Sequence, residues 1–442
     1  MNFFTRALAG LLFLAALQTA QAEDLWSVYQ MALERDAKFQ AAEAAYFAAL
    51  EAKPQARSAL LPQVGAQASY SYSDRSIDAL GNTYDIEPEI TQWGLSLSQS
   101  VYKREYWVGL KQADSRVAQA KALYESAKQD LIVRVTEAYV ELLGADDNLR
   151  FARAEKEAIG RQLEQAQRRF EVGLIAITDV KESQASYDQA VANEIAAVNL
   201  LDNAREALQV YTGQYVASAA PITEAMPLAE PEPADMQAWV DTALEQNLQL
   251  KAAQFAAEAS RQEVSRQRGG HYPYVDLSVN YTDSTADQFS TSIGMYEADT
   301  TDTSIMLQAT LPIYLGGYTS SKVREAQSSF QEAQSLLELQ KRETIRQARA
   351  SYLNVTADVA SVKAYARVLD SNRTAAEATE AGFEVGTRTA VDVLLTLSAV
   401  YQGERDYARS RYQYVLNGMR LKLAAGTLTE DDVRSINTWI KP

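Results

Sequence analysis

The sequence contains no cysteine and a single histidine, His271, among its 442 residues. Without cysteine the fold cannot use disulfides, and the chain cannot be a Cys-anchored lipoprotein. One histidine without cysteine gives no basis for a zinc site. Gly-x-Ser-x-Gly and phosphate-binding loops are missing as well, so an envelope hydrolase finds little support. We therefore expect no enzyme, no cofactor and no metal.

Long apolar runs are missing too. No stretch of about 18 apolar residues occurs, so the sequence offers no membrane-spanning helix. A short apolar run, Ala7 to Leu17, follows Arg6 and precedes Ala20-Gln21-Ala22. This order is typical of a secretory signal, so we expect residues 1–22 to be a signal peptide that is removed.

Positive charge is in deficit. Lys and Arg number 42 against 58 Asp and Glu, which gives a formal net charge of −16. The phosphates of nucleic acid would be repelled, which argues against DNA and RNA, and we expect no nucleic acid partner. The acidic surplus fits a solvated surface or a passage that attracts cations.

The sequence contains an internal repeat. Phe170–Val180 (FEVGLIAITDV) recurs as Phe383–Val393 (FEVGTRTAVDV), 213 positions later (383 − 170). Three further pairs of landmarks recur at nearly the same offset: Pro62 and Pro273, Val101-Tyr102 and Ile313-Tyr314, and Gly213 and Gly426. This predicts two structural repeats per chain, at 23–220 and 235–442, joined by a proline-rich linker at 221–234.

Each half is predicted to begin with one helix, from Asp24 to about Ala52 and from Asp235 to about Arg268. Pro54 and Gly269-Gly270 are expected to end these helices. Two strands follow, then a very long helix, a glycine-containing tip and a returning helix.

Four segments alternate strictly between apolar and polar residues, which indicates strands with one apolar and one polar face. Their apolar positions are Val64, Ala66, Ala68, Tyr70 and Tyr72; Trp93, Leu95 and Leu97; Val275, Leu277, Val279 and Tyr281; and Ile305, Leu307, Ala309, Leu311 and Ile313. A soluble sheet can show this pattern, but strands of about ten residues with small polar partners and aromatic ends favour an outer-membrane barrel. We expect Ser76–Glu89 and Ala286–Thr301 to be polar surface loops.

Four strands per chain cannot close a barrel, and an open edge in lipid would leave backbone groups without hydrogen bonds. Eight strands enclose an interior that side chains fill, so a water-filled lumen needs more. Three chains that contribute twelve strands are the smallest assembly that readily encloses such a lumen. This predicts a homotrimer in outer-membrane lipid.

Residues 104 to 172 contain no proline and predict one helix of about 100 Å, unless Gly144 with Asp146-Asp147 interrupts it. On the returning helix, apolar residues recur in sevens: Val180, Tyr187, Leu201 and Leu208, and also Val191 and Val198. Sevenfold recurrence indicates coiled-coil packing. A soluble coiled coil would explain these helices but not the strands.

Each copy of the duplicated motif lies between long helical segments and is predicted to be the tip of a helical hairpin. Gly173 and Gly386 are placed to end the incoming helix, and Thr or Asp to start the next one. We expect the function at these two tips.

These features resemble the TolC family of outer membrane efflux proteins, or outer membrane factors. The resemblance rests on Gln165 to Val180, Leu311 to Gly317 and Gly382 to Leu394, and it extends over essentially the whole mature chain. It implies an α+β membrane protein. The implied fold is a trimeric conduit in which a twelve-stranded outer-membrane β-barrel, with four strands from each chain, is continuous with a long periplasmic α-helical coiled-coil barrel.

The resemblance also implies a function. The chain would be the channel or exit duct of a tripartite efflux or type I secretion system, in the outer membrane of a Gram-negative cell and extending into the periplasm. Its partners would be a periplasmic adaptor (membrane fusion) protein and an inner-membrane pump of the RND, ABC or MFS type. Small toxic compounds and secreted proteins both stay open as cargo. The alternative, from another class, is a soluble periplasmic coiled-coil adaptor or scaffold.

Carried over position by position, the resemblance implies a gate at the helix tips. Asp179 and Arg388 match an ion pair between helices, with Thr178 beside the aspartate. Gln162 and Glu380 match a second polar link. The tips themselves, at the two glycines, are the expected contact for the adaptor or pump.

Further along the same helix, Asp392 matches an acidic ring that faces the lumen and would favour cations. Two positions depart from the family. Phe383 stands where a tyrosine bonds the tip aspartate, so the hydroxyl donor is missing. Leu395 stands where a second lumen aspartate is usual, which puts an apolar constriction beside the acidic ring. Without the resemblance, Thr178 and Asp179 would be an N-cap pair for the returning helix and Arg388 a solvated surface cation. Asp392 would be a first-turn acid favoured by the helix dipole, and capping and gating can coexist.

Overall fold

The computed structural model describes residues 22–79, 81–223, 226–291 and 294–440. Most of the expected signal peptide, residues 1–21, lies outside the described residues. Contacts divide the chain into two compact units. Unit 1 holds the residues up to 44, 123–250 and those from 340 onward, and unit 2 holds 45–122 and 251–339. Each unit draws on both predicted repeats. In the described part of the chain, no helix has the length and apolar character needed to cross a membrane.

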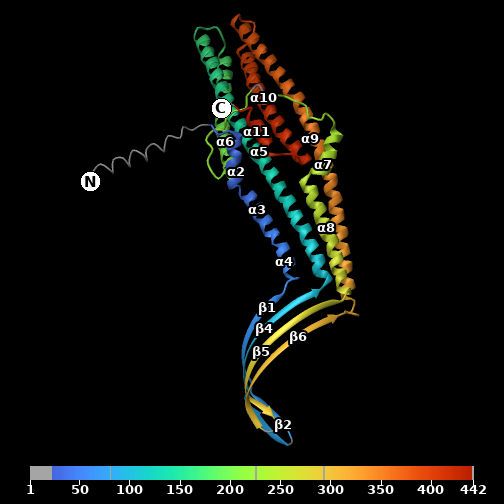
Figure 1. Cartoon of the computed structure of the whole chain (residues 1–442). Coiled ribbons are helices and arrows are strands. Elements are labelled where there is room, and N and C mark those ends of the chain that lie inside the picture. The colour runs from blue at the N-terminus through green and yellow to red at the C-terminus, as the bar shows by residue number, and fades with distance from the viewer. Residues whose placement is uncertain (1–21, 80, 224–225, 292–293, 441–442) are drawn as a thin grey trace, which may run out of the picture. The chain divides into compact units, whose positions relative to one another are not determined.

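Figure 1 labels the elements along the chain. The helices are α2 (Leu25–Arg35), α3 (Ala37–Leu50), α4 (Ala52–Ser58), α5 (Arg104–Glu171), α6 (Ile177–Thr212), α7 (Met236–Gln246), α8 (Leu248–Arg268), the 3-10 helix η2 (Gly269–His271), α9 (Tyr318–Glu384), α10 (Ala390–Ala425) and α11 (Glu430–Asn437). The strands are β1 (Gln63–Tyr72), β2 (Arg75–Ala79), β3 (Asn82–Ile86), β4 (Glu89–Tyr102), β5 (Tyr274–Thr291) and β6 (Gly294–Thr310).

The two halves contain helices of matching length. The long helices α5 and α9 have 68 and 67 residues, and the returning helices α6 and α10 have 36 each. Gly213 and Gly426 end the returning helices with φ angles of 63° and 76°. The predicted long helices are confirmed, and α5 runs through Gly144 without interruption.

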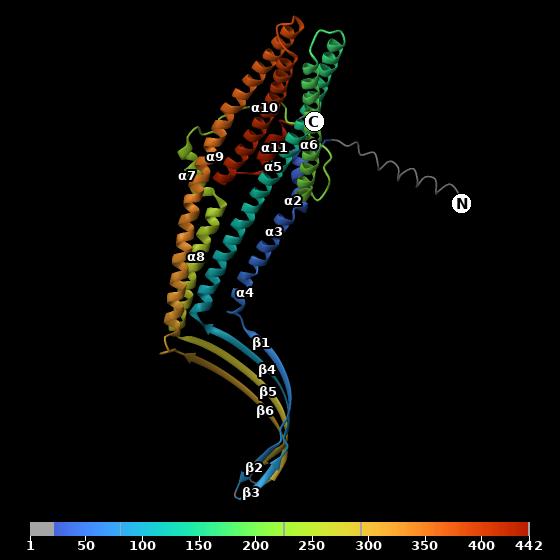
Figure 2. The same cartoon turned by 180° about the vertical axis from the view of Figure 1, so that it is seen from behind.

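The main core of unit 1 gathers apolar side chains from α2, α5, α6, α10 and α11. In both views α2 lies beside α6 and α11 (Figures 1 and 2). Tyr139 is fully buried, and its hydroxyl donates to the carbonyl oxygens of Ala220 at 2.7 Å and Glu23 at 3.2 Å. Arg411 donates to the carbonyl oxygen of Ile222 at 3.3 Å, and Ile222 is itself buried. The start of the predicted linker is therefore packed into this core.

The helix that opens each half is broken, which corrects the expectation of one continuous helix. Asp36 separates α2 from α3, and its carboxylate accepts a hydrogen bond from the backbone N–H of Phe39 at 2.6 Å. Asn247 separates α7 from α8 and accepts from the N–H of Leu250 at 2.9 Å. Asp and Asn are strong N-caps, so each begins a new helix. Pro54 does not end a helix, because it lies in the first turn of α4, where its missing N–H costs nothing.

Unit 2 contains a four-stranded antiparallel sheet with the order β1-β4-β5-β6, strongly curved along its strands (Figures 1 and 2). The register forms rows across all four strands: Val64, Leu97, Val279 and Ile305 make one row, and Gly65, Ser96, Asn280 and Ser304 make the next. Successive rows point to opposite faces of the sheet. The predicted alternation is thus confirmed. The apolar face is open at both edges of the sheet, since Val64 of β1 is 74% exposed and Ile305 of β6 is 73% exposed.

Both connections predicted as loops are largely strands, which corrects that expectation. β2 and β3 form a hairpin that begins at Arg75 and fills most of Ser76–Glu89, and β5 and β6 extend far into Ala286–Thr301. Polar side chains hydrogen-bond across the strands there, as Thr285 does to Asp299 at 2.7 Å. Such cross-strand pairs stabilise a sheet, so polarity alone did not indicate a loop.

β6 ends earlier than the alternation predicts. It stops at Thr310, so Leu311 and Ile313 lie beyond the strand. Pro312 stands between them and has no N–H to donate to a neighbouring strand, which ends the pairing.

Candidate functional site: the two hairpin tips

Both copies of the duplicated motif form helical hairpin tips in unit 1, as predicted. Gly173 and Gly386 adopt φ angles of 76° and 78°, the left-handed region that glycine occupies without strain. The N–H of Leu174 donates to the carbonyl oxygen of Arg169 at 2.9 Å, and the N–H of Thr387 donates to that of Gly382 at 2.8 Å. These are Schellman motifs, which satisfy the last carbonyl groups of α5 and α9.

The two returning helices start differently. Thr389 is the N-cap of α10 and forms a capping box with Asp392, whereas the N-cap of α6 is Ala176, without a side-chain bond. The expectation that Thr or Asp begins both helices is therefore correct for the second tip and wrong for the first. Thr178 and Asp179 lie inside the first turn of α6, where the helix dipole stabilises the negative charge of Asp179.

Asp392 has a structural role that its gate assignment did not include. Its carboxylate accepts from the N–H and from the hydroxyl of Thr389, both at 2.9 Å. The backbone hydrogen bond from Thr389, followed by the one from its side chain, lowers the pKa of Asp392 below its ordinary value of 3.8. The side chain is partly exposed, so capping leaves it charged and open to solvent.

Phe383 is buried at the second tip, with only 5% of its surface exposed, against Ala390 and Val393. The guanidinium of Arg169, from the first tip, lies over its ring at 4.2 Å from the centroid. Arg169 also donates to the carbonyl oxygen of Phe383 at 3.5 Å. This contact between the two tips was missed from the sequence.

One signal could have indicated Arg169. In the repeat it corresponds to Gly382, so the two tips differ in side chain at this position. A Cβ atom on Gly382 would come within 2.8 Å of the Cγ atom of Arg388. The glycine leaves room for Arg388, while at the other tip the arginine crosses to its neighbour.

The predicted polar links are not formed within the single chain. Among the described residues, no ion pair joins Asp179 to Arg388 and no hydrogen bond joins Gln162 to Glu380. Thr178, Arg388 and Glu380 are exposed at their tips, and Asp179 and Gln162 are partly exposed. These links stay a prediction.

Leu395 is 67% exposed on α10, so its apolar side chain has little covering within the chain. The preceding Leu394 is buried instead and packs with Ile159 and Ala190, which joins α10 to α5 and α6 below the tips.

On α6, Leu201 and Leu208 are buried as the sevenfold pattern predicts, but Val198 is exposed.

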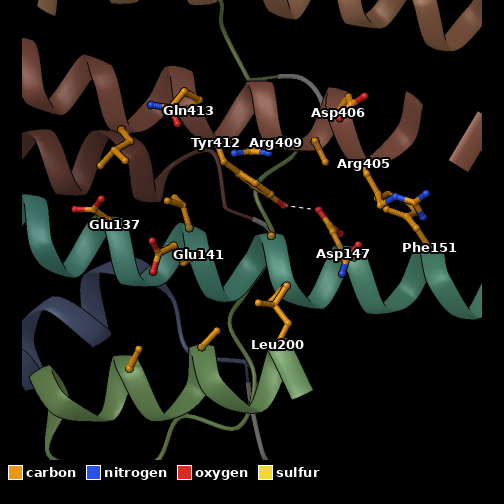
Figure 3. Close-up of a pocket in the computed structure, with 18 of the residues that line it drawn as sticks. Glu137, Glu141, Asp147, Phe151, Leu200, Arg405, Asp406, Arg409, Tyr412 and Gln413 are labelled. Carbon is orange, nitrogen blue, oxygen red and sulfur yellow. Dashed lines mark hydrogen bonds between the residues drawn. The ribbon is translucent and has the colours of Figure 1, made fainter. Parts of the chain in front are cut away.

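A cavity of about 770 Å³ lies farther along unit 1, between α5, α6 and α10 (Figure 3). Tyr412 donates its hydroxyl proton to Asp147 at 2.6 Å across it. Arg420 pairs with Glu137 at 2.8 Å. Burial, and then the charge of Glu137, raise the pKa of Glu141.

Two acidic side chains of α5 at this cavity, Glu137 and Asp147, are thus bonded to residues of α10. Among the described residues, no group of three or more His, Cys, Asp or Glu side chains could hold a metal ion. We interpret the cavity as a gap between packed helices, and the tips as the candidate site.

The chain matches the family described as outer membrane efflux protein over residues 28–214 and 239–427, one match in each half. It is 38% identical over 422 residues to the outer membrane protein TolC of Vibrio cholerae, covering 95% of this chain and 94% of that protein. It is 30% identical over 435 residues to the alkaline protease secretion protein AprF of Pseudomonas aeruginosa, covering 97% of this chain and 90% of that protein.

Among solved structures, the fold is similar to the CmeC outer membrane channel of Campylobacter jejuni. The TM-score is 0.80 at 16% sequence identity, and the match covers 94% of this chain and 90% of that one. At this identity the likeness concerns the fold alone.

Proposed function

Because the chain belongs to the outer membrane efflux protein family, we propose that it is the outer membrane exit duct of a tripartite efflux or type I secretion system. The observation that carries this proposal is the combination of two helical hairpin tips with a sheet whose apolar rows are exposed. The relatives named above include both a TolC protein and a protease secretion protein, so small toxic compounds and secreted proteins are both proposed as cargo.

The sheet supports membrane insertion and self-assembly. β1 and β6 are the two edge strands of the four-stranded sheet. In lipid, the backbone groups at these edges must find hydrogen bonds on another chain. A homotrimer with twelve strands closes the barrel around a lumen, with apolar rows such as that of Val64 and Ile305 toward lipid. The outer membrane is the proposed location.

The long helices supply the second part of the proposed duct. With three copies, α5, α6, α9 and α10 line a coiled-coil barrel that is continuous with the β-barrel and extends into the periplasm. The tips at Gly173 and Gly386 close its end and receive the periplasmic adaptor and the inner-membrane pump. The two repeats, 23–220 and 235–442, contribute one hairpin each.

The gate assignment is part of this proposal. Asp179 and Arg388 carry opposite charges at different tips, and Arg388 is exposed and free to reach a neighbouring protomer. Three copies of Asp392 would surround a narrow axis and favour cations. Leu395 lies one helical turn away and would add an apolar ring.

A soluble periplasmic adaptor or scaffold is the alternative, and extraction separates the two. The purified full chain should require detergent, migrate as a heat-sensitive oligomer on a gel, and have three copies by light scattering in detergent. A chain that dissolves in buffer as a monomer and never enters a bilayer would contradict the exit duct and favour the adaptor.

A further inference from the structure

We propose that Arg169 and Phe383 form the clasp that holds the two hairpin tips of one chain together when the duct is closed. Arg169 would then be a positioning residue of the gate. This inference rests on the proposed function, and it names the residues that keep the duct closed.

The contact joins the ends of two helices that are far apart in the sequence. Arg169 lies in the last turn of α5 and Phe383 in the last turn of α9. The guanidinium stands 4.2 Å from the ring centroid, within the range in which a cation is attracted to an aromatic face. The described hydrogen bonds, ion pairs and ring contacts include no other link between residues 162–180 and 380–395.

A second effect acts in the same direction. The carbonyl groups at the end of a helix carry partial negative charge, which a nearby cation stabilises. Arg169 donates to the carbonyl oxygen of Phe383, at the end of α9, with a long distance of 3.5 Å. The arginine of one hairpin therefore interacts with both the ring and the helix end of the other.

The neighbouring arginine shows that this arrangement is specific to position 169. Arg168 pairs with Glu164, one turn earlier on its own helix, and its side chain is 74% exposed. No carboxylate partner of Arg169 is described. The two arginines thus carry the same charge at the same helix end, but only Arg169 reaches the second tip.

The chemistry of Phe383 fits this role. A phenyl ring has no hydroxyl, so it cannot form a polar link to a tip carboxylate. Its face is the feature that a cation can bind, and burial holds that ring in place. When the tips move apart to open the duct, this contact must break. A contact of this kind shifts the ratio of closed to open tips by about two- to fivefold per chain.

The test is single-channel recording of the full-length protein in planar bilayers. Arg169→Gln keeps a polar side chain without the cation, and Phe383→Leu keeps apolar burial without the ring. Both should raise the open fraction several-fold, and the double variant should do no more than either alone, because they remove one contact. Arg169→Lys retains the cation and should not raise the open fraction. Phe383→Tyr retains the ring and adds the hydroxyl donor that the family has at this position, so it should keep the open fraction at or below that of wild type.

Arg168→Gln is the matched control and should leave the open fraction unchanged. Each variant must keep the heat-sensitive oligomer band of the wild type. A conducting wild type with an unchanged Arg169→Gln, or an equal effect of Arg168→Gln, would overturn the clasp alone. A wild type without any conductance would overturn the proposed duct and the clasp with it.

Discussion

Thr389 and Asp392 cap each other at the start of α10. The backbone N–H of Thr389 donates to Asp392 Oδ2 at 2.9 Å, and the N–H of Asp392 donates back to Thr389 Oγ1 at 3.2 Å. The same carboxylate is the one assigned to the acidic ring of the gate. The capping box that orders the start of α10 therefore also fixes the position of the Asp392 carboxylate.

The repeat offers a test of this capping box. Thr389→Ala should destabilise the first turn of α10 by about 1 kcal/mol, since it removes an N-cap side chain. At the first tip, Ala176→Thr should place a hydroxyl three residues before Asp179 and create the missing box, which stabilises the start of α6. Amide hydrogen exchange at the two tips should speed up in the first variant and slow down in the second. Unchanged exchange in both would contradict the capping account.

Acid stability should depend on Glu263 in unit 2. The hydrogen bond from Arg266 lowers the pKa of Glu263 from its ordinary 4.5 to about 2, against the opposing effect of burial and with help from Gln267 and Gln112. Since the folded pKa is the lower one, the stabilisation is complete above pH 4.5 and is lost as the pH falls toward 2.

The measurement is the difference in melting temperature between wild type and Glu263→Gln across that range. It should shrink steadily as the pH falls from 4.5 to about 2. Glu258→Gln is the control, because Glu258 pairs with Arg261 at a more exposed position and should matter less. A difference that stays constant with pH would exclude this ionisation as the cause.

Leu395 should set how readily water and ions pass the proposed constriction. Leu395→Asn removes an apolar ring and should raise conductance with little change in selectivity, because a polar ring wets more easily. Leu395→Asp should raise both conductance and the preference for cations over anions. Leu395→Ile keeps the ring apolar and serves as the control. Equal currents in all three variants would place the constriction elsewhere.

Much of the fold could be predicted because its signals are local. Alternation at Val275 to Tyr281 and a proline-free run after Arg104 each identify their element without knowledge of its neighbours. The break at Asp36 was missed because an apolar pattern continues across it, and only the cap to Phe39 reveals the new helix.

The candidate site divides in the same way. The glycines of both tips follow from local backbone geometry and were predicted. The contact of Arg169 with Phe383 joins two helix ends over 200 positions apart, and no local pattern contains it. The pair of Asp179 and Arg388 stays a proposal, because no ion pair joins these two residues in the described part of the chain.

The most direct test of the central claim, a trimeric membrane duct that its own helix tips close, is conductance in planar bilayers. Wild type should give small, cation-preferring currents, and Asp179→Ala or Arg388→Ala should enlarge them. Thr427→Ala, just beyond the end of α10 that lies away from the tip, should not. Wild-type currents that neither tip substitution changes would contradict closure at the tips.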